Sequence, residues 1–305
     1  MPHRRRPALT LIAALWVAAP PVAAAPALDY VGTFVWTDDR PSFGGFSGIE
    51  IGADGTRFHA LSDRATLVWG SIERDAQGVI RAMNVAGRAA LRDSDGTPLP
   101  PGYLGDSEGL AIGSDGTIWV SFEGLNRVAR YADPDAPARL APDLPDLAAF
   151  RSNTGLEALA IDPDGQILAV PERSGGASVP FPVLRLREGA WDQPFSIPRS
   201  GPYLPVGADF GPDGWLYLLE RDFQGILGFA SRVRRFRIDG DRIAAGETLL
   251  ETRRLQYDNL EGISVWEDGQ SLRLTMISDD NFLFLQRTEL VEYRLRPPAD
   301  RAARP

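Results

Sequence analysis

Acidic side chains recur at two equivalent places in five similar segments of the sequence. Each segment has an apolar run, an Asp-Gly pair and a second apolar run, and the aspartates of the pairs are Asp54, Asp115, Asp164, Asp213 and Asp268. Seven residues before each pair, a first column holds Ser47, Glu108, Glu157, Val206 and Glu261. Seven to eleven residues after it, a second column holds Asp63, Glu123, Glu172, Glu220 and Asp279. Because a carboxylate beside an apolar run is costly to bury unpaired, this recurrence points to a shared cation.

The residue types favour a hard metal ion. Several carboxylates that converge on one channel repel each other unless a cation lies among them. The sequence has no cysteine, and His59 is the only histidine after residue 25, so oxygen ligands for Ca²⁺, or less favourably Mg²⁺, are expected rather than a zinc or copper site. The expected metal ligands are Glu108, Glu157, Glu261, Asp63, Glu123, Glu172, Glu220 and Asp279. In the alternative interpretation, these acids cap strands or pair with neighbouring arginines.

Arginines accompany the second column. Three of its acids are followed directly by arginine, in Asp63-Arg64, Glu172-Arg173 and Glu220-Arg221, and Arg127 lies four residues after Glu123. A guanidinium binds phosphate with two hydrogen bonds, so the expected substrate-binding residues are Arg64, Arg127, Arg173 and Arg221. The alternative, equally open from the sequence, is that these pairs are salt bridges that hold the repeated units of the fold together.

Other catalytic machinery is missing from the sequence. Ser47 lies in GGFSGI, which lacks the glycine that follows a nucleophile-elbow serine by two residues. His59 directly follows Phe58 in an expected strand and favours a structural role. No phosphate-binding Walker loop is present. Hydrolysis by this chain is therefore expected to depend on a metal.

The spacing of the turns indicates how the acids are positioned. Asp-Gly between two apolar runs is a strong hairpin signal, and successive turns are 61, 49, 49 and 55 residues apart. One four-stranded propeller blade needs about 40 to 50 residues. The sequence therefore predicts an all-β protein, a β-propeller with five blades, or six if a degenerate blade lies in the longer first interval. The strand expected at residues 28–36 would complete the last blade.

Composition and the chain ends predict an exported protein. Residues 1–25 have three arginines, an apolar stretch and Ala23-Ala24-Ala25, which is typical of a signal peptide; a membrane anchor is the alternative. We expect a single propeller domain at 28–296, a disordered tail at 297–305, and a periplasmic or secreted monomer. The formal net charge is −9, and −12 without the three arginines of the leader. Such a charge disfavours nucleic acid and anionic membranes as partners.

Three segments carry a resemblance to a known family. DSEGLAIGSDGTIWVSFEG from Asp106, NTGLEALAIDPDG from Asn153 and DNLEGISVWEDG from Asp258 resemble signature segments of the phytase-like family, bacterial exported proteins described as "esterase-like activity of phytase". The resemblance covers about residues 29–295. The same motifs are similar to gluconolactonase propellers, which place a metal-binding glutamate at a comparable strand start. Two departures break the symmetry, since Ala158 replaces the usual glycine and Val206 occupies the acidic column.

The resemblance implies hydrolysis of phosphoric esters by analogy with calcium-dependent propeller phytases. We therefore expect a metal-dependent ester hydrolase that acts on small anionic esters, most of all phosphate monoesters, with Glu108, Glu157 and Glu261 as its catalytic residues. Two alternatives remain open from the sequence: a gluconolactonase-like lactonase, and a non-catalytic envelope propeller that binds a ligand.

Overall fold

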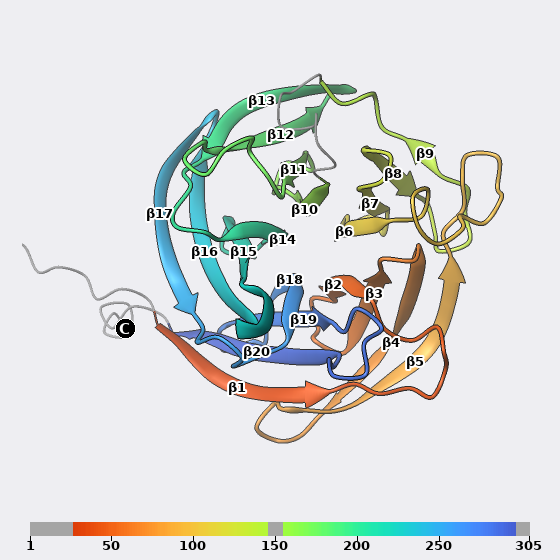
Figure 1. Ribbon diagram of the computed structural model, residues 1–305, viewed down its shortest axis with the longest axis vertical. Coiled ribbons are helices and arrows are strands. Elements are labelled where there is room, and N and C mark those ends of the chain that lie inside the picture. The colour runs from red at the N-terminus through yellow and green to blue at the C-terminus, as the bar shows by residue number, and fades with distance from the viewer. Residues whose placement is uncertain (1–26, 146–154, 297–305) are drawn as a thin grey trace, which may run out of the picture.

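The protein folds into a ring of antiparallel sheets around a central axis (Figure 1). The computed structural model describes residues 27–145 and 155–296. These residues form five four-stranded sheets, which confirms the predicted all-β, five-bladed propeller. The longer first interval holds no additional blade in the described part of the chain; the loop after the outermost strand of the first blade fills it. The predicted leader and tail lie outside the described residues.

Each blade runs from an innermost strand at the axis to an outermost strand at the rim. Blade 1 consists of β2 (Phe46–Ile51), β3 (Arg57–Ser62), β4 (Thr66–Arg74) and β5 (Ile80–Ala90). Blade 2 consists of β6 (Ser107–Ile112), β7 (Ile118–Phe122), β8 (Arg127–Tyr131) and β9 (Arg139–Leu140). Blade 3 consists of β10 (Leu156–Ile161), β11 (Ile167–Pro171), β12 (Phe181–Arg187) and β13 (Ala190–Ile197). Blade 4 consists of β14 (Leu204–Phe210), β15 (Trp215–Phe223), β16 (Phe229–Asp239) and β17 (Arg242–Glu251).

Blade 5 joins the two ends of the described chain. It contains β18 (Asn259–Glu267), β19 (Leu272–Asp279) and β20 (Glu289–Arg296), and its fourth strand is β1 (Ala27–Val35). β1 pairs antiparallel with β20 on the outside of the ring (Figure 1), which confirms the predicted closure by an N-terminal strand. The closure covers a sheet edge that would otherwise expose unpaired backbone groups.

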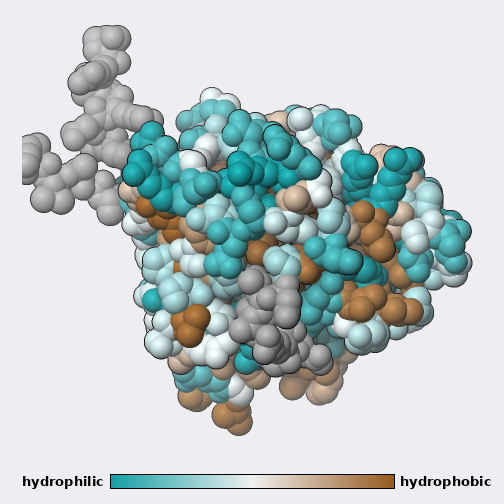
Figure 2. All heavy atoms as spheres, turned by 90° about the horizontal axis from the view of Figure 1, so that it is seen from above, coloured by the Kyte–Doolittle hydropathy of each residue, from teal (hydrophilic) through white to brown (hydrophobic). Residues whose placement is uncertain are grey.

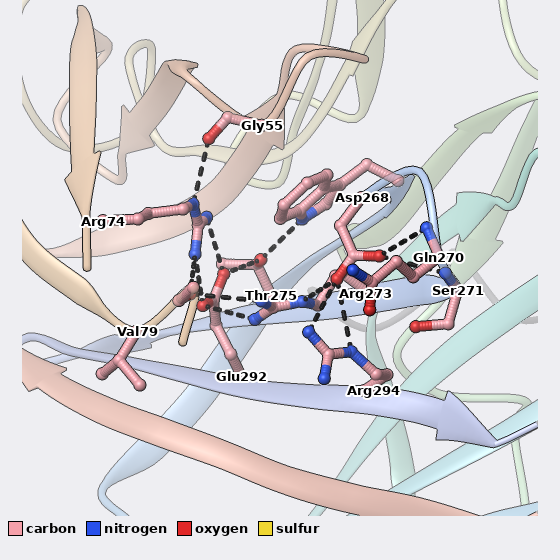
Figure 3. Close-up of polar contacts among 12 residues, drawn as sticks. Gly55, Arg74, Val79, Asp268, Gln270, Ser271, Arg273, Thr275, Glu292 and Arg294 are labelled. Carbon is pink, nitrogen blue, oxygen red and sulfur yellow. Dashed lines mark hydrogen bonds and ion pairs between the residues drawn. The ribbon is translucent and has the colours of Figure 1, made fainter. Parts of the chain in front are cut away.

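A buried polar cluster holds blade 5 against blade 1 (Figure 3). Arg74 on β4 donates two hydrogen bonds to the carboxylate of Glu292 on β20, at 2.5 and 2.8 Å. Thr275 and Arg273 of β19 donate to the same carboxylate at 2.7 and 3.3 Å. Because Glu292 is almost completely buried, these donors compensate a charge that could not otherwise lie there.

The predicted hairpins form at all five Asp-Gly pairs. The five glycines have φ between 69° and 84°, which residues with a Cβ adopt rarely. In four copies the aspartate of the pair accepts the backbone N–H two residues later, as in Thr117 N–H to Asp115 at 2.9 Å. In the third copy Asp162 takes that role instead, because it accepts from Asp164 and Gln166. The turn aspartates are therefore structural.

The innermost strands share an irregularity at the first acidic column. In blade 3, Leu156 pairs with Pro171 and Ala158 pairs with Val170, so Glu157 has no partner in β11. The same shift in register occurs at the other four column positions, Ser47, Glu108, Val206 and Glu261. A β-bulge re-aims the side chain of its extra residue, which explains how glutamates within apolar strands can reach the axis.

Glycines allow the innermost strands to approach each other closely. A Cβ on Gly207 would lie 2.4 Å from the backbone oxygen of Glu261, and one on Gly262 would lie 2.9 Å from the backbone nitrogen of Ile49. The gap left at this level is about 10 Å³, room for about one water molecule. The axial channel is therefore closed at mid-height, and its two mouths are separate.

Apolar clusters between neighbouring blades form the core. The cluster between blades 5 and 1 includes Trp36, Phe58, Trp266 and Leu290, all at most 4% exposed. By contrast, the outer face in Figure 2 is mostly hydrophilic, with hydrophobic residues in separate small patches. Among the described residues, no helix is long and apolar enough to cross a membrane.

Candidate metal centre at one mouth of the channel

The glutamates of the first column lie together at the mouth where the innermost strands begin. Glu108, Glu157 and Glu261, on β6, β10 and β18, are 8–9% exposed. Burial raises the pKa of each carboxyl group, and the charges of neighbouring acids add to it: Glu157 and Glu261 raise the pKa of Glu108 further. Ser47 and Val206 occupy the other two column positions, so the ring is not symmetric.

In the second column, the equivalent residues of the five blades are given by strand pairing and not by their distance from the turn in the sequence. The residue just before each bulge pairs with Ser62, Phe122, Pro171, Glu220 or Ser278. The residues that follow these partners are therefore equivalent, and they are Asp63, Glu123, Glu172, Arg221 and Asp279. Blade 4 thus places Arg221, not Glu220, at the mouth, because neighbouring residues of a strand point to opposite faces.

Glu220 lies inside blade 4, apart from the other acids. Its side chain is completely buried and accepts hydrogen bonds from Arg232 at 2.8 Å and from Arg234 at 2.6 and 2.7 Å. Two guanidinium groups on β16 therefore already neutralise this carboxylate. The structure does not bring Glu220 to the site at which a metal was expected.

Arg221 places a positive charge among the acids of this mouth. Its guanidinium donates to the carboxylate of Glu261, to Asn259 Oδ1 at 2.9 Å and to Glu172 at 3.3 Å. It thereby joins blade 4 to blades 5 and 3, as the salt-bridge interpretation of the arginines expects. The charge of Arg221 also offsets the burial that raises the pKa of Glu261. Arg221 therefore offsets part of the negative charge in this half of the mouth.

The other half contains three acids that form no ion pair with an arginine in the described part of the chain. Asp106, Glu108 and Glu123 each present a carboxylate oxygen, and these oxygens all lie within 4.8 Å of one another. After burial, the strongest influences on the pKa of Glu108 are four other acids, and all of them raise it. Three hard oxygen donors around an uncompensated negative charge fit Ca²⁺ or Mg²⁺. Asp106, Glu108 and Glu123 are the residues that could hold such an ion.

Asp106 was not among the residues singled out from the sequence. It precedes β6 by one residue and therefore belongs to neither acidic column. The feature of the sequence that could have indicated Asp106 is its position two residues before Glu108, at the start of a strand.

Asp63 and Asp279 flank the cluster on the side of blades 1 and 5. Burial raises the pKa of Asp63 to about 6, and Glu261 and Asp106 raise it as well. Burial and the charge of Glu261 raise the pKa of Asp279 to about 8. These influences show that both carboxyl groups lie within electrostatic reach of Glu261.

The four expected substrate-binding arginines have different surroundings. Arg173 is 60% exposed and pairs with Glu172 at 3.1 Å, and Arg64 is exposed with its guanidinium 3.2 Å from the centre of the Phe282 ring. Arg127 instead donates to the backbone oxygens of Leu104 and Leu125 at 2.5 and 3.2 Å. With Arg221 engaged by acids, Arg64 and Arg173 are the more accessible of the four.

Ser47 and His59 have structural surroundings. The hydroxyl of Ser47 donates to the backbone oxygen of Ser107 at 2.8 Å, which links blades 1 and 2. Burial lowers the pKa of His59, which lies opposite Glu50 in the ladder of blade 1.

Comparison with known proteins identifies a family. The model of the phytase-like family, described as "esterase-like activity of phytase", matches residues 41–282. A search of curated proteins finds no match. Among solved structures, the aldose sugar dehydrogenase of Streptomyces coelicolor is 14% identical, with a TM-score of 0.45, over 89% of this chain and 100% of that chain. A gluconolactonase of Xanthomonas campestris is 17% identical, with a TM-score of 0.43, over 82% and 72% of the two chains.

A third similar structure is a calcium-binding regucalcin of Agrobacterium tumefaciens. It is 12% identical, with a TM-score of 0.45, over 83% of this chain and 92% of that chain. At such identities and scores, none of these structures supports an argument about activity. The family match covers most of the chain and all five innermost strands. The chain therefore belongs to the phytase-like family.

Proposed function

We propose that this protein is an exported, calcium-dependent ester hydrolase that acts on phosphate monoesters. The observation that supports the proposal most is the cluster of Asp106, Glu108 and Glu123 at the mouth of the channel. It lies in a chain of the phytase-like family. Magnesium is the less favoured ion, because loops and strand ends gather oxygen ligands with the irregular geometry that calcium accepts.

Each group at the mouth has a place in the proposal. Asp106, Glu108 and Glu123 hold the ion, and the ion, when bound, supplies positive charge for an anionic ester. Arg64 and Arg173 attract the ester from the rim, since both side chains are exposed there. Glu157 and Glu261 line the same mouth, where Arg221 holds Glu261 in place.

Release of phosphate tests the proposal. The purified protein would be freed of metal with a chelator, resupplied with calcium, and assayed with p-nitrophenyl phosphate. We expect calcium-dependent turnover that Glu108→Gln abolishes and that Glu267→Gln, at the opposite mouth, leaves unchanged. Absence of phosphate release from this ester and from other phosphate monoesters would contradict the proposal. Turnover of gluconolactone instead would favour the lactonase, and binding without turnover would favour a ligand-binding propeller.

A further inference from the structure

The mouth opposite the candidate metal centre contains a cavity that is much larger than the gap at mid-height. Residues from all five innermost strands and from the hairpins after them line an open space of about 880 Å³. Small-molecule sites typically measure about 300–1,000 Å³. Because the channel is closed at mid-height, this cavity is separate from the mouth that holds Glu108. The proposed hydrolysis makes no use of it.

Two half-buried carboxyl groups on inner strands line this cavity, Glu50 of β2 and Asp209 of β14. Asp209 accepts the backbone N–H of Val265 at 2.6 Å, and Glu50 accepts the hydroxyl of Ser264 at 3.4 Å. Burial raises the pKa of Asp209 to about 7, and burial together with the charge of Asp209 raises the pKa of Glu50. Among the described residues, no arginine forms an ion pair with Glu50 or Asp209.

The other lining residues include both acidic and apolar side chains. Besides Glu50 and Asp209, the carboxyl groups in the lining are Asp115, Asp162 and Glu267, whereas Arg130 is the single guanidinium. The walls include Trp119, Trp266, Ile161 and Val265. Arg130 already lies over the ring of Trp119, and Arg74 lies over that of Trp266, so the tryptophans offer apolar contact rather than a site for the charge. A positive ligand with an apolar part is complementary to both features, because the carboxylates attract its charge and the walls contact its hydrocarbon part.

A smaller hollow adjoins this cavity. A cavity of about 580 Å³ shares Trp119, Arg130 and Ile167 with the first and is also lined by Gln166. The Oε1 atom of Gln166 is buried and has no hydrogen-bond partner among the described residues. Because this oxygen is buried, it offers no contact to a ligand in the cavity, and a ligand would be recognised by the carboxyl groups and the apolar walls.

We propose that this second cavity binds a small organic cation, with its ammonium group between Glu50 and Asp209 and its hydrocarbon part against the tryptophan and isoleucine walls. A bare metal ion would leave the apolar walls without a contact. A neutral polyol would bring no positive charge to balance the excess of carboxylates. The chemical class that matches the whole lining is therefore an amine with an apolar substituent.

Calorimetric titration with 2-phenylethylammonium chloride at pH 8 tests the proposal, with 2-phenylethanol as the neutral probe of nearly the same shape. We expect one saturable site for the ammonium ion, with an affinity about tenfold or more above that of the alcohol. Glu50→Gln and Asp209→Asn, which keep an acceptor oxygen for Ser264 and Val265, should each weaken binding about tenfold or more. Glu108→Gln, at the other mouth, should leave it unchanged.

Several outcomes would overturn the proposal. Equal affinity for the alcohol would show a neutral apolar site, and unchanged ammonium binding in both variants would place the cation elsewhere. No saturable binding up to about 10 mM would remove the site altogether. Should both variants fail to fold, the comparison of the two probes on the unaltered protein decides. The proposed ester hydrolysis is tested separately from this site, because Glu50→Gln should leave the hydrolysis unchanged.

Discussion

The guanidinium of Arg221 donates a hydrogen bond to the carboxylate of Glu261 across the junction between blades 4 and 5. This pair divides the acidic mouth into two unequal halves. On the side of blades 3, 4 and 5, Arg221 forms ion pairs with Glu172 and Glu261. On the side of blade 2, Asp106, Glu108 and Glu123 converge with no ion pair to an arginine among the described residues. The proposed calcium site lies in that second half.

Replacement of Arg221 by methionine should destabilise the protein strongly. The side chain of Arg221 is 18% exposed, and its removal leaves the buried carboxylate of Glu261 with only the amide of Asn259 and that of Glu172 with only the exposed Arg173. Breaking a buried ion pair from one side typically costs about 3–5 kcal/mol. Urea unfolding measures the loss. Arg173→Met is the matched control, because an exposed pair contributes about 0–1 kcal/mol; equal effects of the two substitutions would contradict the assignment.

The stability of the metal-free protein should fall as pH rises from about 4 to about 8. The pKa of Asp279 is about 8 in the folded protein, against an ordinary value of 3.8. Between these two values the folded state binds more protons than the unfolded state, so the free energy of unfolding decreases with pH. Asp63, with a pKa of about 6, acts in the same direction between about pH 4 and pH 6.

Thermal unfolding between pH 5.5 and pH 8.5 measures this dependence. Asp279→Asn should make the melting temperature depend less on pH, because the group that takes up the proton is gone. The substitution keeps an oxygen that can accept the N–H of Asn281, which Asp279 accepts at 2.6 Å. If the variant keeps the pH dependence of the original protein, Asp279 does not have the raised pKa that its burial implies.

Closure of the ring should depend on Arg74 and Glu292. Arg74→Met leaves the buried carboxylate of Glu292 with only Arg273 and Thr275, and the expected loss is about 3 kcal/mol or more. Arg296→Met is a suitable control, because Arg296 on β20 pairs with Asp29 on the closing strand β1, and the two side chains are 62% and 49% exposed. Chemical unfolding of both variants should show a loss of at most about 1 kcal/mol for the control.

Gly207→Ala should destabilise the centre of the propeller. The new methyl group would lie 2.4 Å from the backbone oxygen of Glu261, and backbone cannot rotate away as a side chain can. Overpacking of this kind typically costs about 1–3 kcal/mol. Gly176→Ala, whose methyl group would meet only a side-chain atom of Val179 at 3.2 Å, is the comparison. A neutral effect of Gly207→Ala on the unfolding free energy would show that the strands can separate.

The blades could be predicted from the sequence because their signals are local. Asp-Gly pairs fix the hairpins, and their spacing fixes the number of four-stranded units. The first column was also visible, because one bulge recurs at the same distance from each turn. Closure by β1 followed from the need to cover a sheet edge.

The partners of the acids depend on register and on contacts between blades, which spacing does not reveal. In blade 4 a difference of one residue placed Arg221 at the mouth and Glu220 inside the sheet. Asp106 belongs to no column, so its convergence with Glu108 and Glu123 appears only in three dimensions. The pair of Glu50 and Asp209 joins strands of two different blades, and no sequence motif links them.

Calcium titration of the metal-free protein tests the central claim most directly. The original protein should bind one calcium ion at the mouth, and Glu108→Gln should weaken that binding on the order of 100-fold, since even outer groups of a metal site contribute about 10–100-fold. Glu267→Gln, an acid of the opposite mouth, should bind calcium as the original protein does. Calcium affinity that Glu108→Gln leaves unchanged, or no binding at all, would contradict the assignment of Asp106, Glu108 and Glu123 as the metal centre.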